Sequence, residues 1–172
     1  MSLSPLLSAS PAIQIHVAAA VLAMPVGAFA LLRRSRDPLH KMAGRLFAVL
    51  MAVTILSSFF IWSIRMIGPF SPIHVLSVLS TVTLVSSVVH IRRRQIAKHA
   101  AAMRALYWQA LGIAGLFTLL PGRLMHRVIF GQDNWLAAGL VIAGGLAALA
   151  WFIGRPALLS RFSSSLRKTD PL

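Results

Sequence analysis

Histidines are the side chains in this chain that are most able to carry chemistry. The six of them stand in a sequence that is 58% hydrophobic: His16, His40, His74, His90, His99 and His126. A neutral imidazole binds transition metals and haem iron through one ring nitrogen, and it exchanges a proton near neutral pH. The chain has no cysteine and only three acidic residues, all of them aspartate. Metal or redox chemistry must therefore depend on histidine.

The shortage of acids and thiols excludes several classes of function. Hydrolases with paired carboxylates, carboxylate metal cages and EF-hand loops need acidic residues, and disulfides, iron–sulfur clusters and cysteine zinc sites need cysteine. Serines are plentiful, but no carboxylate is available to orient a histidine beside one, so nucleophilic catalysis has no support. A zinc site is disfavoured because the histidines are spread along the chain. Any enzymatic role is at most a redox role.

Five apolar stretches are long enough to place these histidines in a membrane. A bilayer core of ~30 Å needs about 20 apolar residues in a helix, and the stretches that qualify are 12–32, 46–64, 73–91, 105–122 and 135–154. Backbone polar groups have no water partner in lipid, so each stretch is predicted to be helical. The sequence predicts an all-α integral membrane protein with five transmembrane helices, the first four forming an up-down bundle. Residues 1–156 are predicted to form one domain, and 157–172 to form a basic cytoplasmic tail.

The positive charges predict how the chain is oriented. Fourteen of the 17 Lys and Arg residues lie in the loops after the first and third spans and in the tail, and the other side has only Arg65, Arg123 and Arg127. The positive-inside rule places the N-terminus outside and the C-terminus in the cytoplasm. Insertion into the lipid bilayer then explains the net charge of +14, and no nucleic-acid partner is expected. The first span has no signal-peptide features, and the whole suits a multi-pass protein of a bacterial plasma membrane.

Three helix starts share a local pattern. Ser10-Pro11, Asp37-Pro38 and Ser71-Pro72 each place a capping side chain before a proline suited to the first helical position. The pattern places His40 and His74 at the third position of their helices, near the membrane interface. The fourth helix is predicted to open at His99, because residues 92–98 are too charged to enter lipid.

The histidines form two pairs in the predicted topology. In an up-down bundle the first and third helices are diagonal, as are the second and fourth. His16 and His74 then share an outer level, and His40 and His99 share an inner level. The two axial ligands of a haem approach the iron from opposite sides, so the layout predicts haem b bound at two depths. The alternative for each histidine is an amphipathic residue at the depth of the lipid headgroups.

The remaining candidates have different interpretations. His90 lies sixteen residues beyond His74 and therefore on another side of the same helix, so we expect an interfacial residue beside Arg92. His126 is expected to be a hydrated residue of an outer loop. Arg123 is a candidate for binding a haem propionate or a lipid phosphate, because guanidinium groups bind such anions through two hydrogen bonds.

Four motifs occur together in this chain: HKMAGR at 40–45, SPIH at 71–74, KHAAAM at 98–103 and LPGR at 120–123. In combination they resemble a bacterial family of small multi-pass proteins described as predicted membrane proteins of unknown function, over residues 12–130. The resemblance implies the fold and the importance of the four paired histidines, but no reaction. The layout is also similar to the two-haem membrane cytochromes b, whose ligands commonly lie deeper in the bilayer than His40 and His99 would.

Two functions from different classes are open at this point. The first is a haem b electron carrier that passes electrons between a quinone and another redox partner in the membrane. The alternative is a non-redox accessory or assembly protein, whose basic cytoplasmic face would bind anionic lipid or an acidic partner. A proton-coupled transporter is disfavoured because no predicted span contains Asp or Glu.

Overall fold

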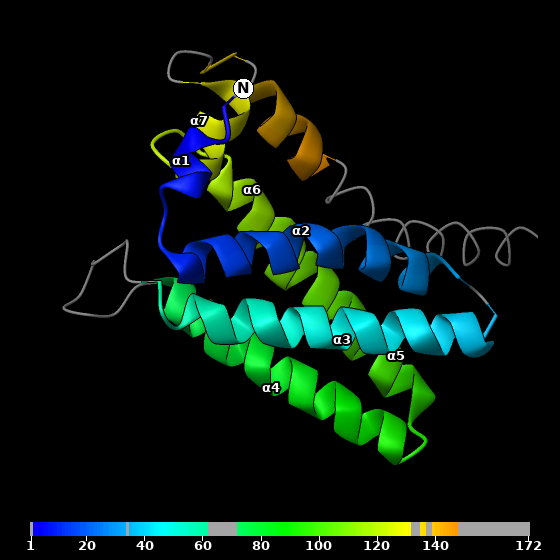
Figure 1. Cartoon of the computed structure of the whole chain (residues 1–172). Helices are drawn as coiled ribbons and strands as arrows, with labels where there is room; N and C mark the ends of the chain where they lie inside the picture. The colour runs from blue at the N-terminus through cyan, green and yellow to red at the C-terminus, as the bar shows by residue number, and fades with distance from the viewer. Residues whose placement is uncertain (1, 34, 62–71, 132–134, 137–138, 148–172) are drawn as a thin grey trace, which may run out of the picture.

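The computed structural model describes residues 2–33, 35–61, 72–131, 135–136 and 139–147 (Figure 1). Within these ranges the chain is helical and contains no strand. Residues 139–147 are helical and follow the named elements. These elements are α1 (Ser4–Leu7), α2 (Pro11–Leu32), α3 (Pro38–Ser58), α4 (Pro72–Arg92), α5 (Ile96–Ala105), the π-helical η1 (Leu106–Ile113), α6 (Ala114–Thr118) and α7 (Leu124–Phe130).

The three long helices begin at the prolines that the sequence indicates. α2 begins at Pro11 and α3 at Pro38, where the Asp37 carboxylate accepts a hydrogen bond of 3.0 Å from the backbone N–H of His40. α4 begins at Pro72, and Ser71 before it lies outside the described residues. The second helix starts eight residues before the predicted span at 46, because its charged first turns are helical as well. The end of that span, at 62–64, lies outside the described residues.

The fourth long helix consists of α5, η1 and α6, which follow one another from Ile96 to Thr118. The prediction that this helix opens at His99 is wrong, since α5 begins at Ile96 and the N–H of His99 donates to the carbonyl of Gln95 at 3.0 Å. The charged residues that seemed to forbid a helix are exposed, Lys98 among them, so the first turn of α5 needs no apolar surroundings. The predicted fifth span lies only in part within the described residues.

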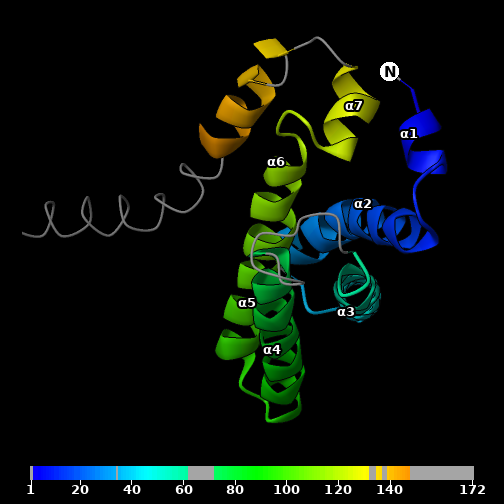
Figure 2. The ribbon, with the colours of Figure 1, turned by 90° about the vertical axis from the view of Figure 1, so that its left-hand side faces the viewer.

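Each long helix packs against the next one along the chain, and the last of them contacts the first. α2 lies beside α3, α3 contacts α4, α4 contacts α5 and η1, and η1 returns to α2. Figure 2 shows α3 end-on, with α4 and the α5–α6 column beside each other, and in Figure 1 both of these run obliquely to α2 and α3. The short helices α1 and α7 contact each other at one end of the molecule. The candidate sites lie between α2 and α3 on one side and the later helices on the other.

A close approach of three helices forms the centre of the core. Phe47 and Met51 of α3 and Leu106 of η1 are almost fully buried there. A Cβ atom at Gly27 of α2 would lie 2.6 Å from the Phe47 ring and 2.8 Å from the Tyr107 ring. The absence of a side chain at Gly27 therefore allows α2, α3 and η1 to pack tightly.

The outer face is apolar and the interior contains hydroxyl groups. On α4, Val75 and Val82 are 71% and 60% exposed, whereas Ser80 and Ser87 are buried. Water would favour the reverse distribution, but lipid favours an apolar surface and polar groups that face neighbouring helices. Within the described residues, three helices are long and apolar enough to cross a membrane: Pro11–Leu32, Pro38–Ser58 and His74–Arg92. The count of five spans, their orientation and the up-down bundle stay predictions.

Candidate histidine sites

The first site is a cavity of ≈ 200 Å³ between the end of α2, the start of α3 and the start of α5. His40 and His99 both line this inner cavity, although 58 intervening residues separate them in the sequence. Three arginines line it as well: Arg33, Arg36 and Arg104. The fold therefore brings the predicted inner pair of histidines to one cavity with a basic lining.

The His99 ring is held by α4. Its Nδ1 lies 3.0 Å from the carbonyl oxygen of Ser87 and 2.9 Å from the Ser87 hydroxyl. A carbonyl oxygen can only accept a hydrogen bond, so Nδ1 carries the proton and Nε2 of the neutral ring keeps its lone pair. Histidines that bind metals are commonly oriented in this way, with the second nitrogen donating to a carbonyl.

His40 approaches the same cavity from α3. Its backbone N–H caps the helix by donating to Asp37, which fixes the start of α3. Its Nδ1 atom is buried and has no hydrogen-bond partner among the described residues. A buried polar atom without a partner is destabilising by about 1–3 kcal/mol, so this nitrogen favours a ligand or water in the cavity.

The arginines of the inner cavity differ in their surroundings. Arg33 forms an ion pair with Asp37, and its Nε donates to Oδ1 at 2.9 Å. The hydrogen bond from Arg33, with a second from the His40 N–H, holds the pKa of Asp37 well below its usual range. Arg36 and Arg104 are exposed at the edge of the cavity. The edge is therefore positively charged and suited to an anionic group.

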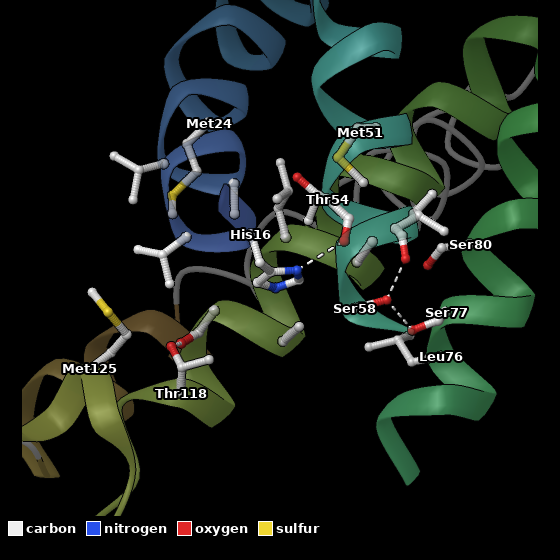
Figure 3. A pocket seen from close by; sticks show the side chains of 18 residues that line it. His16, Met24, Met51, Thr54, Ser58, Leu76, Ser77, Ser80, Thr118 and Met125 are labelled. Atoms are coloured by element: carbon white, nitrogen blue, oxygen red, sulfur yellow. Dashed lines mark hydrogen bonds between the residues drawn. The ribbon is translucent and has the colours of Figure 1, made fainter. Parts of the chain in front are cut away.

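The second site surrounds His16, on the N-terminal half of α2 (Figure 3). Its Nδ1 lies 2.8 Å from the carbonyl oxygen of Thr54 and 3.2 Å from Oγ of Ser57, both on α3. The carbonyl again requires the proton on Nδ1, so Nε2 of neutral His16 is an acceptor. His16 lines an outer cavity of ≈ 120 Å³ bounded by α2, α3, α4, η1, α6 and α7.

Hydroxyl groups of α3 and α4 complete the polar side of this outer cavity. Oγ of Ser58 donates to the carbonyl of Ile55 at 2.6 Å and lies 2.6 Å from Oγ of Ser77 (Figure 3). Ser80 and Thr118 also line the cavity. The hydroxyls on α3 were not among the candidate residues of the sequence analysis. The sequence feature that could have identified them is the occurrence of Ser and Thr within apolar spans, where their hydroxyls donate to backbone carbonyls three or four residues back.

His74 lies on α4 one turn before Ser77. Its side chain is buried, and its ring centroid lies 6.4 Å from that of Phe59. Leu76 and Ser77 line the cavity of His16, whereas His74 is not among its lining residues. The pairing of His16 with His74 across one haem therefore stays a prediction.

Two other candidates, His90 and Arg123, line neither cavity. Nδ1 of His90 lies 2.9 Å from the amide oxygen of Gln95, at the turn between α4 and α5. Arg123 lies over the ring of Phe117, with 4.5 Å between its guanidinium carbon and the ring centroid. Arg123 was the predicted partner of an anionic group, but the arginines that line the cavity of His40 are Arg33, Arg36 and Arg104.

The expectation of a hydrated His126 is wrong. Its side chain is 2% exposed, and Nδ1 lies 3.0 Å from the carbonyl oxygen of Leu119. Its ring packs at 5.3 Å from the ring of Phe130, between centroids. The cause is the turn after α6, which folds α7 back against α6 and α1. The sequence marked this turn by a proline and a glycine but did not show which face of α7 it covers.

The apolar surface and the polar interior define a helical membrane protein. The model of the family described as "Predicted membrane protein (DUF2306)" matches residues 13–154, which include all six histidines. The chain belongs to this DUF2306 family. Comparison with curated proteins and with solved structures gives no match.

Proposed function

We propose that this membrane protein binds one haem b between His40 and His99 and transfers electrons. The observation that carries the proposal is that these two histidines, from α3 and α5, line the same cavity. The hydrogen bond from His99 to Ser87 leaves Nε2 of that ring with a lone pair for iron. The buried Nδ1 of His40, without a partner among the described residues, adds a second indication of a ligand.

The lining of the inner cavity fits the chemistry of a haem. Phe47 and Met103 are buried, apolar side chains that exclude water, and a Cβ at Gly44 would meet no atom within 4 Å. Arg36 and Arg104 would bind propionates at the exposed edge. Ligand cavities typically measure about 300–1,000 Å³, so a porphyrin would fill this one and extend beyond it on the open side. A bound haem supplies one-electron transfer, tuned by its axial ligands and its burial.

The proposal is restricted to one haem. The predicted outer pair has a different environment, because the lining of the His16 cavity includes Ser77 rather than His74. The proposed electron path runs between a quinone and a redox partner in the membrane. The proposed location is a bacterial plasma membrane, with the basic loops on the cytoplasmic side.

An absorbance spectrum of the purified protein tests this function. Protein from haem-replete cells is expected to show a Soret band, with sharp bands after reduction. His40→Ala and His99→Ala are each expected to remove it. The matched control is His90→Ala, a histidine of α4 that does not line the cavity. A colourless and fully folded preparation would overturn the proposal and favour the non-redox accessory protein.

A further inference from the structure

We propose that the cavity of His16 binds the head of a quinol, an uncharged hydroquinone ring with an apolar tail. The use of the quinol's electrons rests on the proposed function, whereas its binding does not require haem. The proposal follows from three features of the outer half of the molecule. These are the chemistry of the polar lining, an adjoining apolar cavity and the protonation of His16.

The polar lining of the His16 cavity suits an uncharged head group. Its hydrogen-bonding side chains are an imidazole and hydroxyls, and none of the described residues that line it is Lys, Arg, Asp or Glu. A phosphate or carboxylate head would be desolvated there without a cation to pair with, which is strongly unfavourable. Phospholipids and fatty acids therefore fit this cavity poorly, and an uncharged ring with oxygen substituents fits it well.

A larger apolar cavity of ≈ 460 Å³ adjoins the first. The two cavities share six lining residues: Val21, Met24, Leu111, Gly115, Thr118 and Met125. Tyr107 and Trp108 of η1 line the apolar cavity, and Met24 and Met125 lie where the two meet. Aromatic rings and thioethers make favourable contacts with flat rings and alkyl chains. The second cavity is large enough for the body and tail of an amphiphile whose head is near His16.

The protonation of His16 favours the reduced form of the ligand. Nδ1 donates to the Thr54 carbonyl, so Nε2 of the neutral ring can only accept a hydrogen bond. A hydroquinone has O–H groups to donate, whereas the quinone has only acceptor oxygens. Ser58 and Ser77, whose hydroxyl oxygens lie 2.6 Å apart, line the same cavity as the imidazole and add to its polar lining (Figure 3).

Calorimetric titration of the full-length protein in detergent with decyl-benzoquinol tests the binding. The key variant is Gly115→Leu, because a Cβ at Gly115 meets no atom within 4 Å and a longer side chain would occupy both cavities. We expect saturable binding to the wild type, weakened about tenfold or more by the substitution. The matched control is Gly139→Leu, which also meets no atom and lines neither cavity, and it is expected to bind as the wild type does.

Three outcomes would overturn the inference. They are equal binding of the quinol to wild type and Gly115→Leu, equal affinity for decanol, and tighter binding of decyl-benzoquinone than of the quinol. Because the titration measures the binding of the quinol and not the Soret band, its failure is distinct from the failure of the haem proposal. Saturable quinol binding by a protein that never binds haem would refute the proposed function alone.

Discussion

The imidazole of His99 on α5 is oriented by Ser87 on α4, through hydrogen bonds to both its carbonyl and its hydroxyl oxygen. Ser87 is completely buried, so water does not compete for these bonds. The carbonyl fixes the tautomer and the hydroxyl adds a second acceptor. Any chemistry at Nε2 of His99 therefore depends on the contact between two helices, and it is sensitive to a residue that lies outside the inner cavity.

Removal of the Ser87 hydroxyl should weaken haem binding without abolishing it. In Ser87→Ala the carbonyl still orients the ring, and we expect a loss of roughly tenfold in haem affinity, measured by titrating haem into the apoprotein at the Soret band. Ser87→Thr should restore most of the affinity. The control is Ser86→Ala, whose hydroxyl donates within α4 to the Thr83 carbonyl. Equal losses in the two alanine variants would contradict the positioning role.

Substitution by alanine should have opposite effects on stability at Gly27 and at Gly44. Gly27→Ala places a Cβ within 2.8 Å of two aromatic rings and should destabilise the protein by about 1–3 kcal/mol. Gly44→Ala meets no atom within 4 Å and should stabilise it by about 0.5–1 kcal/mol, because alanine loses less backbone entropy in a helix. Thermal unfolding in detergent, followed by circular dichroism, measures both. A stabilised Gly27→Ala would show that α2, α3 and η1 do not meet as described.

Asp37 should contribute stability that is lost only in acid. Its pKa is lowered in the folded protein by Arg33 and the His40 N–H, against about 3.9 in an unfolded chain. The contribution is therefore complete above the unfolded pKa and declines as the pH falls toward the lower folded value. Melting temperatures of wild type and Asp37→Ala should differ equally at pH 7 and pH 5, and the difference should shrink below about pH 4.

Asp37→Asn separates the cap from the ion pair. Asparagine caps helices about as well as aspartate, so this variant should lose less stability than Asp37→Ala. A melting-temperature difference that grows in acid would contradict the assigned direction of the pKa shift.

The orientation of the chain has a direct test. A reporter enzyme fused after Leu172 should be active in the cytoplasm, because the basic loops and tail are predicted to stay on that side. The same reporter fused after Ser10 should be active on the outer side. Cytoplasmic activity at both ends would indicate an even number of spans, and outer activity at Leu172 would reverse the predicted topology.

Much of the helical architecture was predictable because its signals are local. Proline after a capping residue marked the starts of α2 and α3, and the lengths of the apolar runs identified three helices that are long enough to span a membrane. The start of α5 at Ile96 was missed because charge in a sequence does not show whether a turn lies in lipid or outside it. The π-helical geometry of η1 was also missed, since no residue type specifies it.

The sites were predictable only in part, because they depend on how helices cross. The diagonal rule paired His40 with His99, and both line one cavity. The same rule paired His16 with His74, and this pairing stays a prediction, since Ser77 lines the outer cavity and His74 is not among its lining residues. The arginines beside His40 and the Thr54 carbonyl beside His16 come from other elements. Spacing within one helix does not reveal such partners.

The two cavities lie toward opposite ends of α2, with His16 lining one and Ala30 lining the other. Fourteen residues of helix separate these positions by about 21 Å, roughly two thirds of a ~30 Å hydrocarbon core. An electron that passes between the two proposed sites would therefore move through most of the membrane's electric field. A full crossing of the membrane by one charge corresponds to about 2.3 kcal/mol per 100 mV, so such a transfer would be electrogenic and would either oppose or contribute to the membrane potential.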